Sequence, residues 1–377
     1  MFAVEMKTKV VKLDSENVDW VRIREAAELV DAGGLVAFPT ETVYGIACRV
    51  TADSLARLDG IKNRDASKAY TLHISRREEI GKYVPTIGIR AGKLIEKAWP
   101  GPLTIVFELD SKDIERRQQS LKREVFQGLY RGNSIGVRCP DNPIGASLLR
   151  RTRHPVVAPS ANMAGQAPAL DAQEVLAAVG GKIDLVLDGG PCKYGKSSTV
   201  AKIGKQGVEI LRSGVYSDAE VQAFSEVKLL CVCTGNTCRS PMAEGIFRKY
   251  LAEKLHCEVD QLGGMGYKVA SAGLLDMGGA SASSESVAAC SARGVDISSH
   301  RSRPLSLELI EESDRIFAME RIHQARVAAL SPDAAGRCVL LAEDEISDPI
   351  GQGKAVYDRC ASQIEKAVRK RIDELAL

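Results

Sequence analysis

The sequence has no long apolar run, no marked excess of one sign of charge and no regular cysteine spacing. No run approaches the roughly 18 apolar residues of a membrane-spanning helix, and residues 1–11 contain two lysines but no apolar core of a signal peptide. With 51 basic and 49 acidic residues, the net charge of +2 gives no general indication of nucleic-acid binding. We therefore expect a protein with no membrane association.

The ten cysteines are scattered and do not follow the rhythm of a disulfide scaffold. In a chain of 377 residues this usage fits a reducing compartment, where a cysteine is catalytic or buried rather than disulfide-bonded. The sequence therefore predicts a cytoplasmic protein.

Length and residue pattern predict two domains. At roughly 150 residues per domain, 377 residues exceed one ordinary core. A strand over 208–211 is followed by a polar segment, and a buried strand starts at Val227. We predict a first domain over 11–215, a linker over 216–226 and a second domain over 227–377. The chain carries 32 basic and 28 acidic residues up to Glu226, then 19 and 21, so the first half is better suited to an anionic ligand.

Hydrophobic periodicity predicts an α/β fold in each half. In the first half, Ile23, Ala26, Ala27 and Val30 form the apolar face of a helix, and strand-like runs follow, some separated by helical stretches. The second half alternates strands and helices regularly, which favours a parallel sheet covered on both faces. We predict strands over 35–38, 103–107, 135–138, 155–158, 183–187 and 199–203, then 227–232, 267–270, 315–319 and 338–341.

The most informative segment of the second half is CTGNTCRSP over 233–241, between a predicted strand and a predicted helix. We expect Ser240 to cap the helix and Pro241 to lie in its first turn. The backbone N–H groups of the loop then converge at a helix N-terminus, where they bind anions and lower the pKa of a cysteine placed as Cys233 is. Arg239 can hold two phosphate oxygens with its forked guanidinium. The pattern predicts a thiolate that attacks a phosphoryl group.

That reaction needs an acid for the leaving group. Asp348-Pro349 follows the last predicted strand, whose carboxyl end shares an edge of a parallel sheet with the cysteine loop. We expect Asp348 to be the general acid, and then the base for the hydrolytic water.

These motifs resemble the low-molecular-weight protein tyrosine phosphatase family over residues 227–377. The C-x5-R loop running into SPMAE, the SAG turn at 271–273, DISSHRS at 296–302 and Asp348-Pro349 occur in the family's order. The resemblance implies a Rossmann-like parallel-sheet domain with Cys233 as nucleophile, Arg239 as transition-state clamp and Asp348 as acid, acting on a phosphorylated protein through a phosphocysteine. It also implies that Asn236 and Ser240 hold the loop and the thiolate. The phosphate loop would consist of Thr234, Gly235, Asn236, Thr237, Cys238 and Ser240.

Two residues bear on the substrate. Thr237 stands where tyrosine-directed members usually carry an apolar residue, and its loop resembles the protein-arginine-phosphatase branch. Ile350 stands where those members place an aromatic residue. Phosphoarginine is therefore favoured over phosphotyrosine, which stays an alternative, as does a non-catalytic receptor for phosphopeptides or anions. Arsenate reductase is a further alternative, although residues 301–312 lack its extra cysteines and Cys238 would serve only as a reversible redox partner of Cys233.

In the first half, polar residues recur where predicted strands end, as a nucleotide cleft requires. The segment PTETVYG over 39–45 reads as a polar turn or a capped helix start, and Lys62 and Arg64 read as two cations on an extended or turn segment suited to a polyphosphate. Further motifs in order are WPGPLT at 99–104, GVR at 136–138, PSAN at 159–162 and SSTV at 197–200.

Jointly these motifs resemble the threonylcarbamoyl-AMP synthase (YrdC-like) family over roughly 11–215. The resemblance implies a twisted α/β sheet and formation of threonylcarbamoyl-adenylate from L-threonine, bicarbonate and ATP, for the t6A modification of tRNA. Mg²⁺ is expected with ATP, with no protein metal ligands, and tRNA or proteins of the t6A pathway are candidate partners. Lys62, Arg64, Ser160 and Asn162 would surround the ATP phosphates, Thr104, Ser198 and Arg212 would hold the nucleotide, and Thr40, His73 and Arg138 would hold the threonine and carbamate end. The alternative is a double-stranded RNA-binding module without synthase activity.

Overall fold

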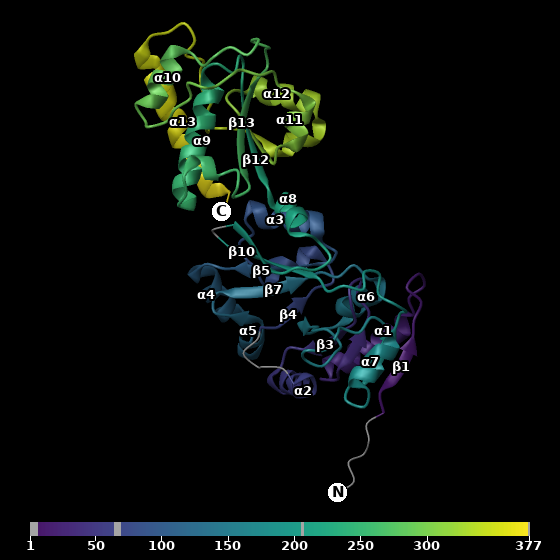
Figure 1. The fold of residues 1–377 in the computed structure, drawn as a ribbon. Coiled ribbons are helices and arrows are strands. Elements are labelled where there is room, and N and C mark those ends of the chain that lie inside the picture. Colours follow the sequence, from purple (N-terminus) through teal and green to yellow (C-terminus); the bar gives the residue numbers. More distant parts are fainter. Residues whose placement is uncertain (1–6, 64–68, 205–206, 376–377) are drawn as a thin grey trace. The chain divides into compact units, whose positions relative to one another are not determined.

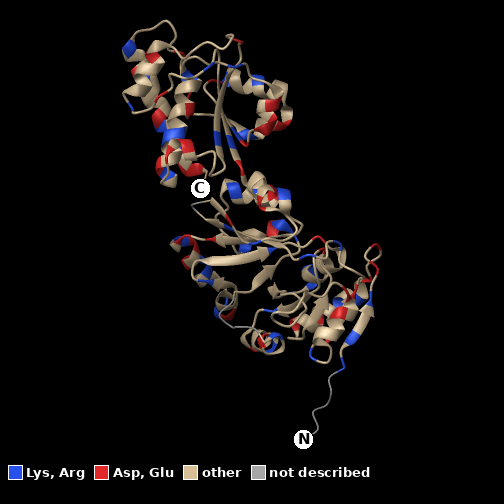
Figure 2. Ribbon diagram, viewed as in Figure 1, with Lys and Arg blue, Asp and Glu red and all other residues tan. Residues whose placement is uncertain are grey.

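In the computed structural model, which describes residues 7–63, 69–204 and 207–375, the chain forms two compact units. The first runs through Ile87 and resumes over Ala91–Phe224; the second comprises Gly88–Arg90 and the chain from Ser225. Basic and acidic residues are intermixed along the helices of both units (Figure 2), as the near-zero net charge predicts. Within the described residues, no helix combines the length and apolar character needed to span a bilayer.

The first unit contains a mixed sheet, which confirms the predicted fold class. Its described strands follow the order β1-β9-β2-β3-β8-β4-β7-β5-β10-β11, and β6 pairs with β7. β4 runs parallel to β7 and β10 parallel to β5, whereas β5 and β7 are antiparallel. The strands are β1 (Lys9–Lys12), β2 (Val36–Phe38), β3 (Gly45–Arg49), β4 (Thr71–His73), β5 (Leu103–Glu108), β6 (Tyr130–Arg131), β7 (Ser134–Arg138), β8 (Val156–Val157), β9 (Leu185–Asp188), β10 (Thr199–Gly204) and β11 (Gly207–Arg212).

Helices cover both faces of this sheet. The Asp19 carboxylate caps α1 by accepting from the Val21 and Arg22 N–H groups, and the apolar stripe predicted for this helix is buried with α6 against one face. α2, α3, α5 and α7 contribute to the core on the other face. The helices are α1 (Trp20–Asp31), α2 (Ala52–Lys62), α3 (Ile89–Ala98), α4 (Ser111–Ser120), α5 (Arg123–Leu129), α6 (Pro143–Arg151), α7 (Ala172–Val179) and α8 (Asp218–Ser225), with a 3₁₀ helix, η1, at Arg77–Lys82.

The second unit is a parallel sheet between two helical layers, as predicted. Its strands lie in the order β13-β12-β14-β15, with α9, α10 and α13 on one side of β12 and β13 and α11 and α12 on the other (Figure 1). The elements are β12 (Val227–Cys233), α9 (Arg239–Leu255), β13 (Tyr267–Gly273), α10 (Ser284–Ser291), α11 (Leu307–Glu312), β14 (Arg315–Ala318), α12 (Arg321–Leu330), β15 (Cys338–Leu340) and α13 (Lys354–Glu374), with 3₁₀ helices η2 (Val259–Gln261) and η3 (Pro332–Arg337).

Two local predictions are corrected, and one of two alternatives is decided. Lys62 is the last residue of α2 rather than part of an extended segment, and Asn63 ends the helix in the left-handed conformation (φ 49°). Of the two interpretations of the segment 39–45, the turn is confirmed, because residues 39–44 bend into β3 and form no helix. α9 begins at Arg239 with Cys238 at the N-cap position, and no side chain caps it, because the Ser240 hydroxyl bonds to a sulfur inside the loop instead.

Candidate active sites

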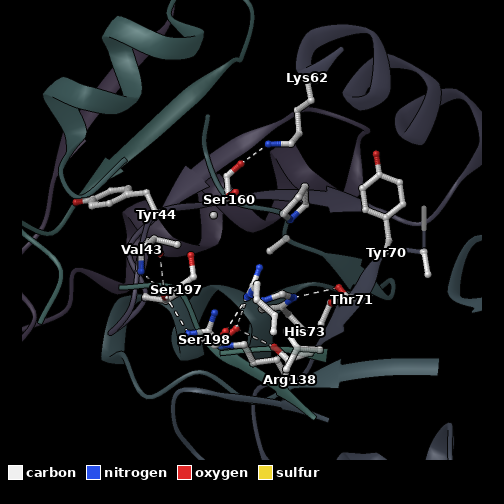
Figure 3. A pocket seen from close by; sticks show the side chains of 18 residues that line it. Val43, Tyr44, Lys62, Tyr70, Thr71, His73, Arg138, Ser160, Ser197 and Ser198 are labelled. Carbon is white, nitrogen blue, oxygen red and sulfur yellow. Dashed lines mark hydrogen bonds between the residues drawn. The ribbon is translucent and has the colours of Figure 1, made fainter. Parts of the chain in front are cut away.

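A cavity of about 260 Å³ in the first unit collects most of the residues predicted there (Figure 3). Lys62 extends toward Ser160, while His73, Arg138 and Ser198 lie together across the cavity. Asn162 does not line it, because its side-chain amide donates to the carbonyls of Met163 (3.0 Å) and Gln166 (2.7 Å). Arg64 lies outside the described residues. The predicted residues that line the cavity are Thr40, Lys62, His73, Thr104, Arg138, Ser160, Ser198 and Arg212.

Lys62 is buried, with 4% of its surface exposed. Its amino group donates to the main-chain carbonyls of Ser160 (2.5 Å) and Asn162 (2.6 Å). The PSAN segment therefore holds Lys62 through its backbone, and the ammonium remains at the wall of the cavity.

Arg138 forms a buried ion pair that the sequence did not reveal. Its guanidinium lies 2.8 Å from the Glu41 carboxylate and donates to the Thr42 hydroxyl at 2.5 Å. The nearby His73 Nδ1 lies 3.1 Å from the Thr71 carbonyl. Burial, and then the charge of Arg138, lower the pKa of His73 to about 3. Because a carbonyl only accepts, the neutral ring donates from Nδ1 and keeps Nε2 as an acceptor.

Thr104, Ser198 and Arg212 form a second polar cluster on the cavity wall. The hydroxyls of Thr104 and Ser198 are 3.0 Å apart, and Arg212 donates to the Ser198 carbonyl (2.7 Å) and hydroxyl (3.1 Å). Burial, and then the charge of Arg138, lower the pKa of Arg212, and both arginines line the cavity. Within the described ranges, no group of three or more His, Cys, Asp and Glu side chains could hold a metal ion.

The second site is the loop between β12 and α9. Two backbone N–H groups of this loop point to the Cys233 sulfur: that of Asn236, at 3.3 Å, and that of Ser240. The other N–H groups of the loop have no acceptor in the described part of the chain. A loop of unpaired N–H groups at a helix N-terminus is an anion-binding nest. The residues with these open N–H groups are Thr234, Gly235, Thr237, Cys238 and Arg239.

The pKa of Cys233 differs from the prediction. The side chain is 2% exposed, and burial raises the pKa of its thiol, against the opposing effects of Ser240, Arg239 and Asn236. The Ser240 hydroxyl lies 2.9 Å from the sulfur. The prediction failed because burial, the largest effect, outweighs the hydrogen bonds from Ser240 and Asn236 and the charge of Arg239.

Asn236 connects the loop to its surroundings. It is fully buried in the left-handed conformation (φ 52°), which asparagine tolerates better than most residues. Its amide donates to the hydroxyls of Ser240 and Ser271, both at 2.8 Å, and its Oδ1 accepts from the Arg303 N–H at 3.0 Å. His300 Nε2 lies 2.8 Å from its carbonyl. Asn236 thus links both the SAG segment and His300 of DISSHRS to the cysteine loop, and the Ser240 hydroxyl adds a contact to the Ala272 carbonyl at 3.4 Å.

Arg239 is held by protein groups at both terminal nitrogens. Nη1 donates to Glu320 (2.7 Å) and to the Ile346 carbonyl (2.8 Å), and Nη2 donates to Thr234 Oγ1 (3.1 Å) and to the Asp348 carboxylate. Its Nε is buried with no partner among the described residues. Apart from Nε, a phosphoryl group can therefore contact Arg239 only by displacing one of these partners; at Nη2 the charged partner is Asp348, whose side chain is 33% exposed.

Two residues of this site were missed from the sequence. Glu320 and His323 stand at the start of α12, directly after β14. His323 is fully buried, and its Nε2 lies 3.1 Å from the Thr234 hydroxyl. The signal that could have found them is their place at the carboxyl end of a parallel strand beside β12. Cys238, which was predicted as part of the loop, has its sulfur 3.4 Å from the Tyr357 hydroxyl and 3.6 Å from the Ser283 hydroxyl.

The two sites define two classes of domain: a nucleotide-type cleft on a mixed sheet and a cysteine-containing phosphate loop on a parallel sheet. A family model described as "Telomere recombination" (Sua5, YciO and YrdC) matches residues 28–214, and one described as "Low molecular weight phosphotyrosine protein phosphatase" matches residues 228–376. The chain belongs to the threonylcarbamoyl-AMP synthase family through its first unit and to the low-molecular-weight phosphatase family through its second.

Individual relatives support the first assignment. A threonylcarbamoyl-AMP synthase of Pyrococcus abyssi is 30% identical over 238 residues, which cover 62% of this chain and 67% of that relative. One from Chromohalobacter salexigens is 32% identical over 192 residues, 51% of this chain and 96% of the relative. The crystal structure of P. abyssi Sua5 complexed with L-threonine has the same fold, with a TM-score of 0.51 at 22% identity over 70% of this chain and 92% of that one.

Proposed function

We propose that the first unit forms threonylcarbamoyl-adenylate from L-threonine, bicarbonate and ATP, for tRNA modification. The proposal rests on one cavity that is lined by three cationic side chains from distant segments of the chain: Lys62, Arg138 and Arg212. Relatives named threonylcarbamoyl-AMP synthase, and a structure with bound L-threonine, support the choice of reaction.

The proposed chemistry needs alignment more than covalent catalysis. The threonine amine and bicarbonate condense to a carbamate and water, and a carbamate oxygen attacks the α-phosphorus as the bond to pyrophosphate breaks. Lys62 and Arg212 would stabilise the charge that develops on pyrophosphate, and neutral His73 would accept a hydrogen bond from substrate through Nε2. Mg²⁺ would enter with the triphosphate.

The test is pyrophosphate release by the full chain. We expect release that requires ATP, threonine and bicarbonate together and stops when any one is omitted. Salt-sensitive binding of double-stranded RNA without pyrophosphate release would favour the RNA-binding alternative instead.

We further propose that the second unit hydrolyses a protein phosphate through a phosphocysteine, because Cys233 lies in an open anion nest beside Arg239 and Asp348. The incoming phosphoryl group displaces Asp348 from Arg239, the proton of the Cys233 thiol passes to Asp348, and the guanidinium charge stabilises the resulting thiolate. Sulfur attacks phosphorus while the bond to the leaving group breaks, and Asp348 protonates the leaving atom. Water then attacks the phosphocysteine, Asp348 accepts its proton, and phosphate and thiolate are released.

The rim of this site favours phosphoarginine over phosphotyrosine. Leu275 is 54% exposed, Met277 44% and Ile350 64%. Leu275 is tied to the loop by its N–H, which donates to the Thr234 carbonyl at 2.9 Å, and Met277 lies beside Gly235. Aliphatic side chains suit the methylene stem of phosphoarginine, whereas a phenyl ring gains more from aromatic neighbours.

Replacing Asp348 by asparagine should slow hydrolysis most for poor leaving groups, because only these need a proton. We expect a loss of about 10²-fold or more in kcat for a weakly acidic leaving group and a much smaller loss for a strongly acidic one. A series of aryl phosphates of graded leaving-group pKa measures this. An equal loss across the series would rule out an acid role.

Replacing Thr237 by isoleucine should shift preference from phosphoarginine toward phosphotyrosine, because an apolar side chain replaces a hydroxyl at the partly exposed loop position. We expect the ratio of kcat/KM for matched phosphoarginine and phosphotyrosine peptides to fall about 10-fold or more. Thr237→Ser, which keeps the hydroxyl, is the matched control. An unchanged ratio in Thr237→Ile would remove Thr237 from the specificity argument.

A further inference from the structure

The hydroxyl of Thr234, the residue after Cys233, receives two hydrogen bonds from buried groups. The first donor is His323. Its Nδ1 accepts from the Glu320 N–H at 3.0 Å, so the single proton of the neutral ring is on Nε2. Burial, followed by Arg239, lowers the pKa of His323 to about 4, so the ring is neutral near pH 7. Nε2 lies 3.1 Å from Thr234 Oγ1 and donates to it.

The second donor is Arg239, whose Nη2 also lies 3.1 Å from Thr234 Oγ1. A hydroxyl oxygen has two lone pairs, and both are now used. What remains is the hydroxyl hydrogen, and the described part of the chain provides no acceptor for it. Because His323 and Arg239 occupy both lone pairs, the Thr234 hydroxyl can form a further hydrogen bond only by donating its own hydrogen.

The location of this hydroxyl indicates its acceptor. Thr234 Oγ1 and the Asp348 carboxylate contact the same nitrogen, Nη2 of Arg239. The phosphoryl group that displaces Asp348 therefore comes to lie beside the hydroxyl, next to the open N–H of Thr234 itself.

We propose that the Thr234 hydroxyl donates a hydrogen bond to an oxygen of the transferring phosphoryl group and that His323 is the residue that positions it. This inference rests on the proposed phosphatase function of the second unit. It gives the site a side-chain donor in addition to Arg239 and the backbone, so binding should depend on the hydroxyl. In this proposal His323 acts on the phosphoryl group through Thr234, and its Nδ1 also accepts from the Glu320 N–H.

The test compares Thr234→Val, which keeps the shape and removes the hydroxyl, with Thr234→Ser, which keeps it. Orthovanadate binding to the full chain is measured by calorimetry, since it does not require turnover, together with kcat/KM for para-nitrophenyl phosphate and the melting temperature. We expect Thr234→Val to weaken vanadate binding and lower kcat/KM by about 10-fold or more, and Thr234→Ser to stay within about threefold of the unmodified protein. His323→Phe should weaken both, but should add nothing in the Thr234→Val background.

The outcomes separate this contact from the phosphatase assignment. Unchanged vanadate affinity in Thr234→Val, with or without a lower melting temperature, would overturn the contact and leave a structural role for the hydroxyl. Absence of vanadate binding by the unmodified protein would also overturn it. Vanadate binding that depends on Thr234 without hydrolysis of any phosphoester would support the contact and refute the proposed phosphatase function.

Discussion

Replacing Cys233 by serine is expected to abolish phosphate release by the second unit, with a loss of about 10⁴-fold or more, because a serine hydroxyl cannot replace the sulfur nucleophile in a phosphocysteine mechanism. Anion binding should persist, since the open backbone N–H groups and Arg239 do not depend on the sulfur. Both quantities are measured on the full chain, as phosphate release from phosphopeptides and as calorimetric binding of orthovanadate.

Cys257→Ser is the matched control, because this partly exposed cysteine lies at the end of α9, outside the loop. It should turn over at the rate of the unmodified protein. Turnover at that rate by Cys233→Ser would refute the nucleophile. Loss of vanadate binding together with turnover would show that Cys233 also holds the shape of the loop.

Replacing Lys62 by alanine is expected to reduce adenylate formation by about 10²-fold or more, because it removes a cationic donor from the cavity wall. The two carbonyls of Ser160 and Asn162 that now accept from the ammonium would also lose this partner. Pyrophosphate release with ATP, threonine and bicarbonate measures the loss, and circular dichroism checks that the unit stays folded.

Lys112→Ala removes the same charge from the exposed surface of α4 and should leave pyrophosphate release unchanged. If Lys62→Ala retained full activity while folded, the triphosphate would have to bind elsewhere. A loss in both variants would indicate a general effect of charge rather than a contact in the cavity.

Elements with strong periodicity could be predicted from the sequence. The apolar stripe of α1 and the alternation of strands and helices in the second unit each encode one buried face, so local pattern and tertiary structure agree. Short elements without such a face were not predicted: β1 is an edge strand with an exposed, basic pattern, and β4 has three residues.

The fold brings together most of the predicted residues, although Asn162 does not line the cavity and Arg64 lies outside the described residues. Their bonding could not be read from motifs. Motif order located Cys233, Arg239 and Asp348, yet not the Glu320 carboxylate that also binds Arg239, because Glu320 belongs to none of the motifs and reaches Arg239 only through tertiary packing. The side chain of Asn162 turns to backbone carbonyls that no spacing rule indicates. Burial of Cys233, which reverses the expected pKa shift, also arises only from tertiary packing.

A crossed assay tests whether one chain carries two separate active sites. Pyrophosphate and phosphate release are measured on the full chain, on Cys233→Ser and on Lys62→Ala. We expect Cys233→Ser to lose only phosphate release and Lys62→Ala to lose only pyrophosphate release. If neither variant lost its assigned activity, or if one folded variant lost both, the assignment of two separate active sites would be contradicted.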